Sequence, residues 1–327
     1  MSSEFALLQE EILRLKQKRR AIILSHNYQR DEVQEVADFT GDSLELSRTA
    51  STIDCDVIVF AGVSFMAESA SILSPDKIVL LPEIDAGCPM ADMISVSSPR
   101  PEIESFPAFN PPAYIYPREF TLRDIKTRYP GVPVVAYVNT TADVKAESYI
   151  CCTSANVVKV IESLPDEKVI CIPDRNLSAW AQQNTKKQVI AWDGFCHVHE
   201  RANIEDVQKA RREHPKALFM AHPECRLDIL NLADHVTSTA GMLRFAKASS
   251  EKEFIVGTEI GLLYRLRKEN PDKVFYPLRK DMICPTMKKT TLKSIIRALK
   301  ENNYIVKVSE EIRIPAKKAL DRMLGIG

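Results

Sequence analysis

Residues 21–28 read AIILSHNY, residues 134–140 read VVAYVNT and residues 217–224 read ALFMAHPE. Each stretch is a short apolar run, rich in β-forming residues, that ends in polar side chains. The apolar parts do not alternate in polarity, as expected for strands that are buried on both faces of a parallel sheet. The three stretches therefore predict three equivalent strands with polar carboxyl ends, which is where ligands bind in α/β proteins.

A hydroxyl residue follows each of these strands at a fixed distance. The distance is 17 residues in all three cases, from His26 to Ser43, from Tyr137 to Ser154 and from His222 to Thr239. A cysteine follows each hydroxyl residue after 45, 42 and 45 residues, at Cys88, Cys196 and Cys284. We therefore predict three repeated βαβαβ units, each ending in a cysteine just past its last strand.

Similar apolar runs alternate with helical stretches along the whole chain, which predicts an α/β fold with right-handed crossovers. The predicted helices include Val33–Ser51, Asn156–Ser163 and an amphipathic N-terminal helix that carries Phe5, Leu8, Ile12 and Leu15 on one face. The predicted strands are Ala21–Ser25, Val57–Ala61, Ile78–Leu81, Val134–Val138, Val169–Ile172, Val189–Trp192, Ala217–Ala221, Phe254–Gly257 and Val274–Tyr276.

The predicted units span residues 1–128, 129–212 and 213–327, the last with a C-terminal tail. Residues 99–117 carry six of the 19 prolines, and we interpret them as an extended surface insertion in the first unit. If the three units face a common axis, their strand ends converge on one central cavity.

The composition limits the classes of function. Lys+Arg and Asp+Glu both number 44 and the isoelectric point is about 7.0, whereas a protein that binds duplex nucleic acid normally has a basic excess. The most apolar run, residues 57–67, is too short to span a membrane. The N-terminus lacks the pattern of a signal peptide, so we expect a cytoplasmic protein with neither nucleic acid nor membrane as a partner.

The three repeated cysteines predict a site of soft ligands at the centre. A structural zinc ion requires four protein ligands, and a [4Fe–4S] cluster is normally held by four cysteines. With only three cysteines, one iron of such a cluster keeps an open position and can act as a Lewis acid. The other five cysteines are expected to be buried and packed, because none forms a C-x-x-C pair; they are Cys55, Cys151, Cys152, Cys171 and Cys225.

The polar residues of the three units predict a binding site for an anion. Ser43, Ser154 and Thr239 occupy expected helix N-termini, where they are either simple N-caps or donors to a carboxylate or phosphate. The strand-end residues are candidates for acid–base work and ligand binding; they are His26, Tyr28, Tyr137, Asn139, His222 and Glu224.

These motifs together resemble the quinolinate synthase (NadA) family. The matching stretches extend from about residue 20 to 293. They include SHNYQRDEVQEVADFTGDSLELSR from residue 25, YVNTTADVKAESYICCTSANV from 137, WDGFCHVH from 192, AHPECRLDILNLADHVTSTAGM from 221 and CPTMKK from 284.

The resemblance implies three pseudo-threefold-related α/β/α domains with parallel sheets around a central active site. It implies one [4Fe–4S] cluster per chain, held by Cys88, Cys196 and Cys284 with one open iron. The implied reaction condenses iminosuccinate with dihydroxyacetone phosphate to quinolinate, phosphate and water in NAD biosynthesis, with functional coupling to an aspartate oxidase or dehydrogenase. By position, the substrate-binding residues are His26, Ser43, Tyr137, Asn139, Ser154, His222, Glu224 and Thr239, and the catalytic residues are Tyr28, Glu224, His26 and His222.

Three other interpretations of the residues remain open. A [4Fe–4S] hydro-lyase that acts on a hydroxy acid would use the same three cysteines, and a metal-free phosphate-binding protein would use none of them. A non-catalytic iron–sulfur carrier would need the cysteines but not the repeated polar residues. The sequence departs from some relatives in two respects. The Pro-rich stretch before Tyr137 is longer, and Cys284 has no C-x-x-C partner, so we expect no redox switch there.

Overall fold

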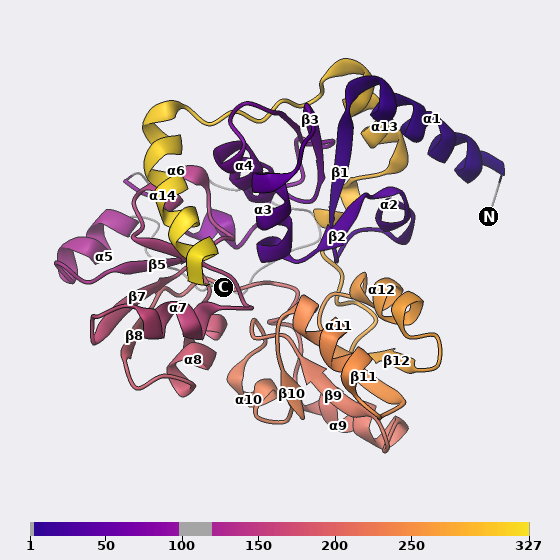
Figure 1. The fold of residues 1–327 in the computed structure, drawn as a ribbon. Helices are drawn as coiled ribbons and strands as arrows, with labels where there is room; N and C mark the ends of the chain where they lie inside the picture. The colour runs from indigo at the N-terminus through magenta and orange to yellow at the C-terminus, as the bar shows by residue number, and fades with distance from the viewer. Residues whose placement is uncertain (1–2, 98–119, 327) are drawn as a thin grey trace.

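The computed structural model describes residues 3–97 and 120–326 and contains three four-stranded parallel sheets. Each sheet forms a separate α/β unit, and the three units surround the centre of the molecule (Figure 1). The strand orders are β2-β1-β3-β4, β6-β5-β7-β8 and β10-β9-β11-β12. The order is the same in all three sheets, which confirms the α/β fold and the internal repeat.

The described strands have the following bounds. The first sheet consists of β1 (Ala21–His26), β2 (Phe39–Gly41), β3 (Val57–Ala61) and β4 (Ile78–Leu80). The second consists of β5 (Val134–Tyr137), β6 (Ile150–Cys152), β7 (Lys168–Ile172) and β8 (Gln188–Ala191). The third consists of β9 (Leu218–Ala221), β10 (His235–Val236), β11 (Glu253–Gly257) and β12 (Val274–Pro277).

The helices lie between these strands and after the last one. Those of the first unit are α1 (Ser3–Arg19), α2 (Asp31–Val36), α3 (Ser43–Thr52) and α4 (Ser64–Leu73), with a 3₁₀ turn at Ala91–Met93. Those of the second are α5 (Leu122–Arg128), α6 (Ala142–Ala146), α7 (Val157–Ser163) and α8 (Arg175–Gln183). They are followed by α9 (Ile204–Glu213), α10 (Leu227–Leu230), α11 (Thr239–Ala248), α12 (Leu262–Glu269), a 3₁₀ turn at Met287–Lys289, α13 (Leu292–Glu301) and α14 (Glu310–Ile326).

The nine predicted strands are confirmed to within a residue or two, but the sequence analysis missed β2, β6 and β10. These three strands have only two or three residues each, too few for a recognisable apolar pattern. The predicted helix Val33–Ser51 is therefore wrong, because β2 separates α2 from α3. Each unit has four strands instead of the three predicted, and the extra strand pairs with the edge of the first strand of its unit.

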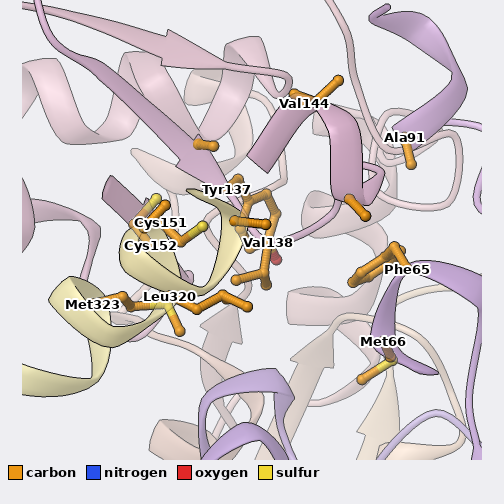
Figure 2. Packing of buried hydrophobic residues seen from close by; sticks show 14 of the residues in the cluster. Phe65, Met66, Ala91, Tyr137, Val138, Val144, Cys151, Cys152, Leu320 and Met323 are labelled. Atoms are coloured by element: carbon orange, nitrogen blue, oxygen red, sulfur yellow. The ribbon is translucent and has the colours of Figure 1, made fainter. Parts of the chain in front are cut away.

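The N-terminal helix is confirmed as amphipathic, with Ile12 and Leu15 buried in the cluster that α13 shares with β1 and β3. The C-terminal helix α14 leaves the third unit and packs on the second. There Leu320 and Met323 lie near Cys151 and Cys152 of β6 (Figure 2), in a core that extends through the first two units. The C-terminal residues thus hold the units together by apolar burial.

Two further findings concern expectations from the sequence. The Pro-rich stretch 99–117 falls outside the described residues. Among the residues that are described, no helix has the length and apolar character needed to cross a membrane.

Candidate active site

A central cavity lies where the carboxyl ends of the three sheets meet. All twelve residues predicted from the sequence line it: His26, Tyr28, Ser43, Cys88, Tyr137, Asn139, Ser154, Cys196, His222, Glu224, Thr239 and Cys284. The sequence prediction that these residues converge is therefore correct, while the role of each remains a prediction.

The eight cysteines divide into two groups by their exposure. Cys88, Cys196 and Cys284 are partly exposed and line the cavity, whereas the other five are buried in the apolar cores. Each of the three follows the last strand of its unit, so one thiol comes from each unit. Three thiols from three units facing one space are the donor set that a soft metal centre requires.

The raised pKa values of these three thiols mean that they need a bound metal to be present as thiolates. Burial raises the pKa of Cys88, Cys196 and Cys284, and the Glu224 charge and the neighbouring thiolates raise that of Cys88 and Cys196 further. Cationic iron would offset this cost, because a coordinated thiol is deprotonated.

The distances between the candidate ligand atoms distinguish a site for a metal cluster from a site for a single ion. Ligands at about 2.3 Å from one zinc ion lie within roughly 4 Å of each other. Among the described residues, the three sulfurs do not form a group within 4.8 Å, whereas Cys196, His199 and Glu224 do. Nε2 of His199 contacts Thr258, and Nδ1 lies only 2.7 Å from Oε2 of Glu224, another member of that group, so the wider cysteine set is the better candidate. That set suits a centre larger than one ion.

His26 and His222 occupy equivalent places in the first and third units and share one local arrangement. The backbone N–H of Tyr28 donates to Nδ1 of His26 at 3.2 Å, and that of Glu224 donates to Nδ1 of His222 at 3.3 Å. Because Nδ1 accepts in both cases, the proton of each neutral ring is on Nε2. Burial lowers the pKa of both rings to about 3, so both are neutral donors at neutral pH.

Glu224 is the charged centre of the cavity wall. Its Oε1 accepts a hydrogen bond from the Tyr137 hydroxyl at 2.7 Å, and its Oε2 lies 2.7 Å from Nδ1 of His199. Burial tends to raise the pKa of Glu224, but His199, His222 and the Tyr137 hydroxyl outweigh burial and lower it. Burial and the nearby Glu224 charge raise the pKa of Tyr137, so its hydroxyl remains a donor. Glu224 is therefore an ionised acceptor at neutral pH.

A chain of contacts joins Glu224 to Tyr28 and involves residues of all three units. Nε2 of His199 lies 2.9 Å from Oγ1 of Thr258, and that oxygen lies 2.7 Å from the Tyr28 hydroxyl. Burial and the Glu224 charge raise the pKa of Tyr28, which keeps its proton in this state. The two predicted proton-transfer residues are thus linked through side chains only.

Sequence reasoning missed His199 and Thr258. Thr258 directly follows β11 (Glu253–Gly257), as His222 follows β9, so the rule that located the other strand-end residues would have found it. His199 lies three residues after Cys196 in a loop, where only the contact with Glu224 distinguishes it.

The hydroxyl residues lie near helix starts, but they are not the N-caps that one interpretation expected. Ser43 and Thr239 are the first residues of α3 and α11, which are capped by Asp42 and Ser238. Ser154 comes before Asn156, the N-cap position of α7. Because other residues cap α3 and α11, the hydroxyls of Ser43 and Thr239 are not needed as caps.

The contacts of the hydroxyls and of Asn139 agree with a role in binding. Oγ of Ser154 lies 3.1 Å from Nε2 of His222, and Oγ1 of Thr239 accepts from Asn27 at 2.9 Å. Oδ1 of Asn139 is buried at the cavity without a hydrogen-bond partner. A buried amide oxygen without a partner is costly unless a ligand supplies one or the amide turns to donate instead.

Comparison with known proteins gives the same picture over nearly the whole chain. The family described as "Quinolinate synthetase A protein" (NadA) matches residues 10–325. A protein of Thermodesulfovibrio yellowstonii named quinolinate synthase is 58% identical over 316 residues, which cover 96% of this chain and 97% of that protein. Proteins of the same name from Geobacter sp. and Methanoregula boonei are 51% and 50% identical, covering 98% of this chain and 97% and 99% of their own lengths. The chain therefore belongs to the NadA family of quinolinate synthases.

Proposed function

We propose that this chain is a transferase that condenses iminosuccinate with dihydroxyacetone phosphate, forming quinolinate, phosphate and two waters for NAD biosynthesis. The observation that carries the proposal is the meeting of one thiol and a set of polar side chains from each unit at one cavity. A carrier of iron and sulfur needs no such polar lining. The relatives named quinolinate synthase support the choice of reaction.

We further propose that Cys88, Cys196 and Cys284 hold one [4Fe–4S] cluster with an open iron. Their partial exposure in the cavity and their separation support this assignment. When bound, such a cluster supplies a Lewis acid that favours the loss of a hydroxyl group as water.

The cavity residues provide donors for the negative charges of both substrates. Neutral His26 and His222 present Nε2–H, and Ser43, Ser154 and Thr239 present hydroxyls. Helices α3 and α11 also begin at the cavity, and a helix N-terminus favours an anion. These donors suit two carboxylates and a phosphate.

Proton transfer falls to Glu224 and Tyr28. Glu224 is ionised and can accept a proton from a carbon or nitrogen of the bound substrate, while Tyr28 is protonated and can donate one. The contacts through His199 and Thr258 provide a route by which the two groups regain their starting states. His199 also orients the Glu224 carboxylate.

The substrates determine the partners that we propose. Iminosuccinate is an unstable imine, so an aspartate oxidase or dehydrogenase must supply it close to the enzyme. A cytoplasmic location suits a cluster with an exposed iron and eight free cysteines, because the cytosol keeps thiols reduced.

The test is quinolinate formation by protein that has been purified and assayed without oxygen. We expect quinolinate and phosphate in equal amounts from iminosuccinate and dihydroxyacetone phosphate, and no product from Tyr28→Phe or Glu224→Gln. The proposal is wrong if iron-loaded protein releases no phosphate with these substrates but dehydrates a hydroxy acid instead.

A further inference from the structure

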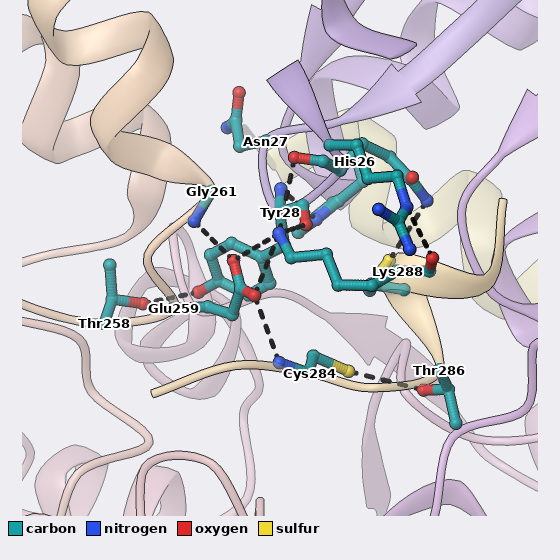
Figure 3. A network of polar contacts seen from close by, with 12 residues as sticks. His26, Asn27, Tyr28, Thr258, Glu259, Gly261, Cys284, Thr286 and Lys288 are labelled. Carbon is teal, nitrogen blue, oxygen red and sulfur yellow. Dashed lines mark hydrogen bonds and ion pairs between the residues drawn. The ribbon is translucent and has the colours of Figure 1, made fainter. Parts of the chain in front are cut away.

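The turn that follows β11 carries a fully buried carboxylate, Glu259, whose two oxygens both have partners. Oε1 accepts from the backbone N–H of Cys284 at 3.1 Å and lies 3.0 Å from Nζ of Lys288. Oε2 accepts from the backbone N–H of Gly261 at 2.6 Å and from Lys288 at 3.2 Å (Figure 3). One buried carboxylate thus fixes the backbone of Cys284, the residue that ends the third unit.

Lys288 extends this contact to the first unit. Its Nζ donates to the backbone carbonyls of Tyr28 and Gln29, and these bonds are drawn with the Glu259 pair in Figure 3. The neighbouring Thr258 contacts the Tyr28 hydroxyl. Thr258 thus contacts the hydroxyl of Tyr28 and Lys288 its backbone carbonyl, while Glu259 contacts the Cys284 loop.

The turn has no room for a larger residue at Gly261. A Cβ there would lie 2.6 Å from Nζ of Lys288 and 2.8 Å from Oε2 of Glu259, closer than real Cβ contacts. The backbone of Gly261 has φ −61° and ψ −25°, which alanine adopts readily, so the requirement for glycine is steric. Gly261 thus lies against both the Glu259–Lys288 contact and the backbone carbonyl of Gln29, whose oxygen is 2.9 Å from the same Cβ position.

The internal repeat shows that the fold itself does not require this carboxylate. Glu259 lies two residues after the end of β11, Asp174 lies two residues after β7, and Val63 lies two residues after β3. Asp174 is also buried and lies close to the backbone N–H of Cys196. Val63, an apolar residue, occupies this position in the first unit, so the carboxyl groups in the other two units have a role beyond the turn.

We propose that Glu259 and Lys288 form a positioning pair that holds the Cys284 loop ready for the cluster and ties it to the backbone of Tyr28. The inference rests on the proposed cluster. We assign Glu259 a positioning role because its contacts are with two backbone N–H groups and Lys288. Removing either partner leaves the other buried without its counter-charge. The Cys284 loop can then move.

The test uses the variants Glu259→Gln, Lys288→Met and Gly261→Ala in the full chain. Asp38→Asn is the control, since Asp38 also accepts from a lysine, Lys16 at 2.6 Å, and from a backbone N–H, that of Ile23 at 2.7 Å, but is partly exposed and lies outside the cavity. After anaerobic loading with iron and sulfide, the measurements are iron per chain and the rate at which a chelator removes the iron. In metal-free samples, mass spectrometry follows alkylation of Cys284 by iodoacetamide, with Cys88 as the internal reference.

We expect the variants of the pair to lose iron about ten- to a hundredfold faster than wild type, the usual effect of removing a group that supports a metal ligand. Cys284 should be alkylated faster, Cys88 at the wild-type rate, and Asp38→Asn should resemble wild type in both assays. Lys288→Met and Gly261→Ala decide the question if Glu259→Gln does not fold.

Wild-type iron loss and wild-type alkylation of Cys284 in folded variants would overturn the inference. So would a Glu259→Gln protein that keeps its iron but makes no quinolinate, since Glu259 would then act in the chemistry. If wild type itself takes up no iron, the proposed cluster fails, and the alkylation of Cys284 still decides whether the pair positions its loop.

Discussion

Replacing Tyr137 with phenylalanine removes one oxygen and, with it, the hydrogen bond that joins the second and third units at Glu224. The Tyr137 side chain is buried, and its hydroxyl donates to Oε1 of an ionised carboxylate at 2.7 Å. A hydrogen bond to a charged group contributes roughly 1.5–3 kcal/mol. We therefore expect Tyr137→Phe to lower the free energy of unfolding by about that amount at neutral pH.

A double-mutant cycle with Glu224→Gln shows whether this loss comes from the contact with the carboxylate. A hydrogen bond between neutral groups contributes only about 0.5–1.5 kcal/mol. In the Glu224→Gln background, the loss in unfolding free energy caused by Tyr137→Phe should therefore be smaller by roughly 1 kcal/mol or more. Urea unfolding at pH 7.5 without oxygen, followed by tryptophan fluorescence, measures all four proteins. Tyr149→Phe, at a side chain that is 46% exposed, is the control and should resemble wild type.

The same loss from Tyr137→Phe in both backgrounds would refute this reasoning. The hydroxyl would then stabilise the protein through packing alone, and Glu224 would not depend on it. The Tyr137 hydroxyl would then no longer explain part of the lowered pKa of Glu224.

Three further predictions concern the metal, the anion site and acid stability. Alanine at any of the three cavity cysteines should remove most of the iron, whereas Cys152→Ala should keep it, as measured by iron content after anaerobic loading. Ser154→Ala should keep iron and melting temperature, because Ser154 caps no helix, and should lower turnover by about ten- to a hundredfold, the loss of one donor to a charged ligand. The folded protein holds His26 and His222 neutral with a pKa of about 3 against the ordinary 6.5, so it binds fewer protons than the unfolded chain between these values. Its stability should therefore fall as pH drops from about 6.5 towards 3, by up to roughly 1.4 kcal/mol per histidine and pH unit, and urea midpoints in His222→Asn should fall less steeply.

The central strands and the convergence of the site could be predicted because both follow from local patterns. Runs such as residues 21–24 are apolar on both faces, and the 17-residue spacing places a hydroxyl at the same point in each unit. Parallel strands end at one edge of a sheet, so equivalent positions such as His26 and His222 face the same space once three sheets surround an axis.

The parts that sequence reasoning missed depend on tertiary contacts. The two residues His235 and Val236 form β10 only because β9 offers an edge for pairing. The N-cap of α3 is Asp42 and not Ser43. Both side chains can cap a helix, and sequence spacing alone does not decide which of two neighbours does so. His199 belongs to the site because it contacts Glu224, which lies 25 residues further along the chain.

The most direct test of the account is the iron and sulfide content of protein purified without oxygen from iron-replete cells, compared with that of Cys88→Ala. The account predicts a brown wild-type protein with about four irons and four sulfides per chain, and a Cys88→Ala protein with little of either. Colourless wild-type protein that forms quinolinate without iron would contradict the central claim, as would a Cys88→Ala protein that keeps the full cluster.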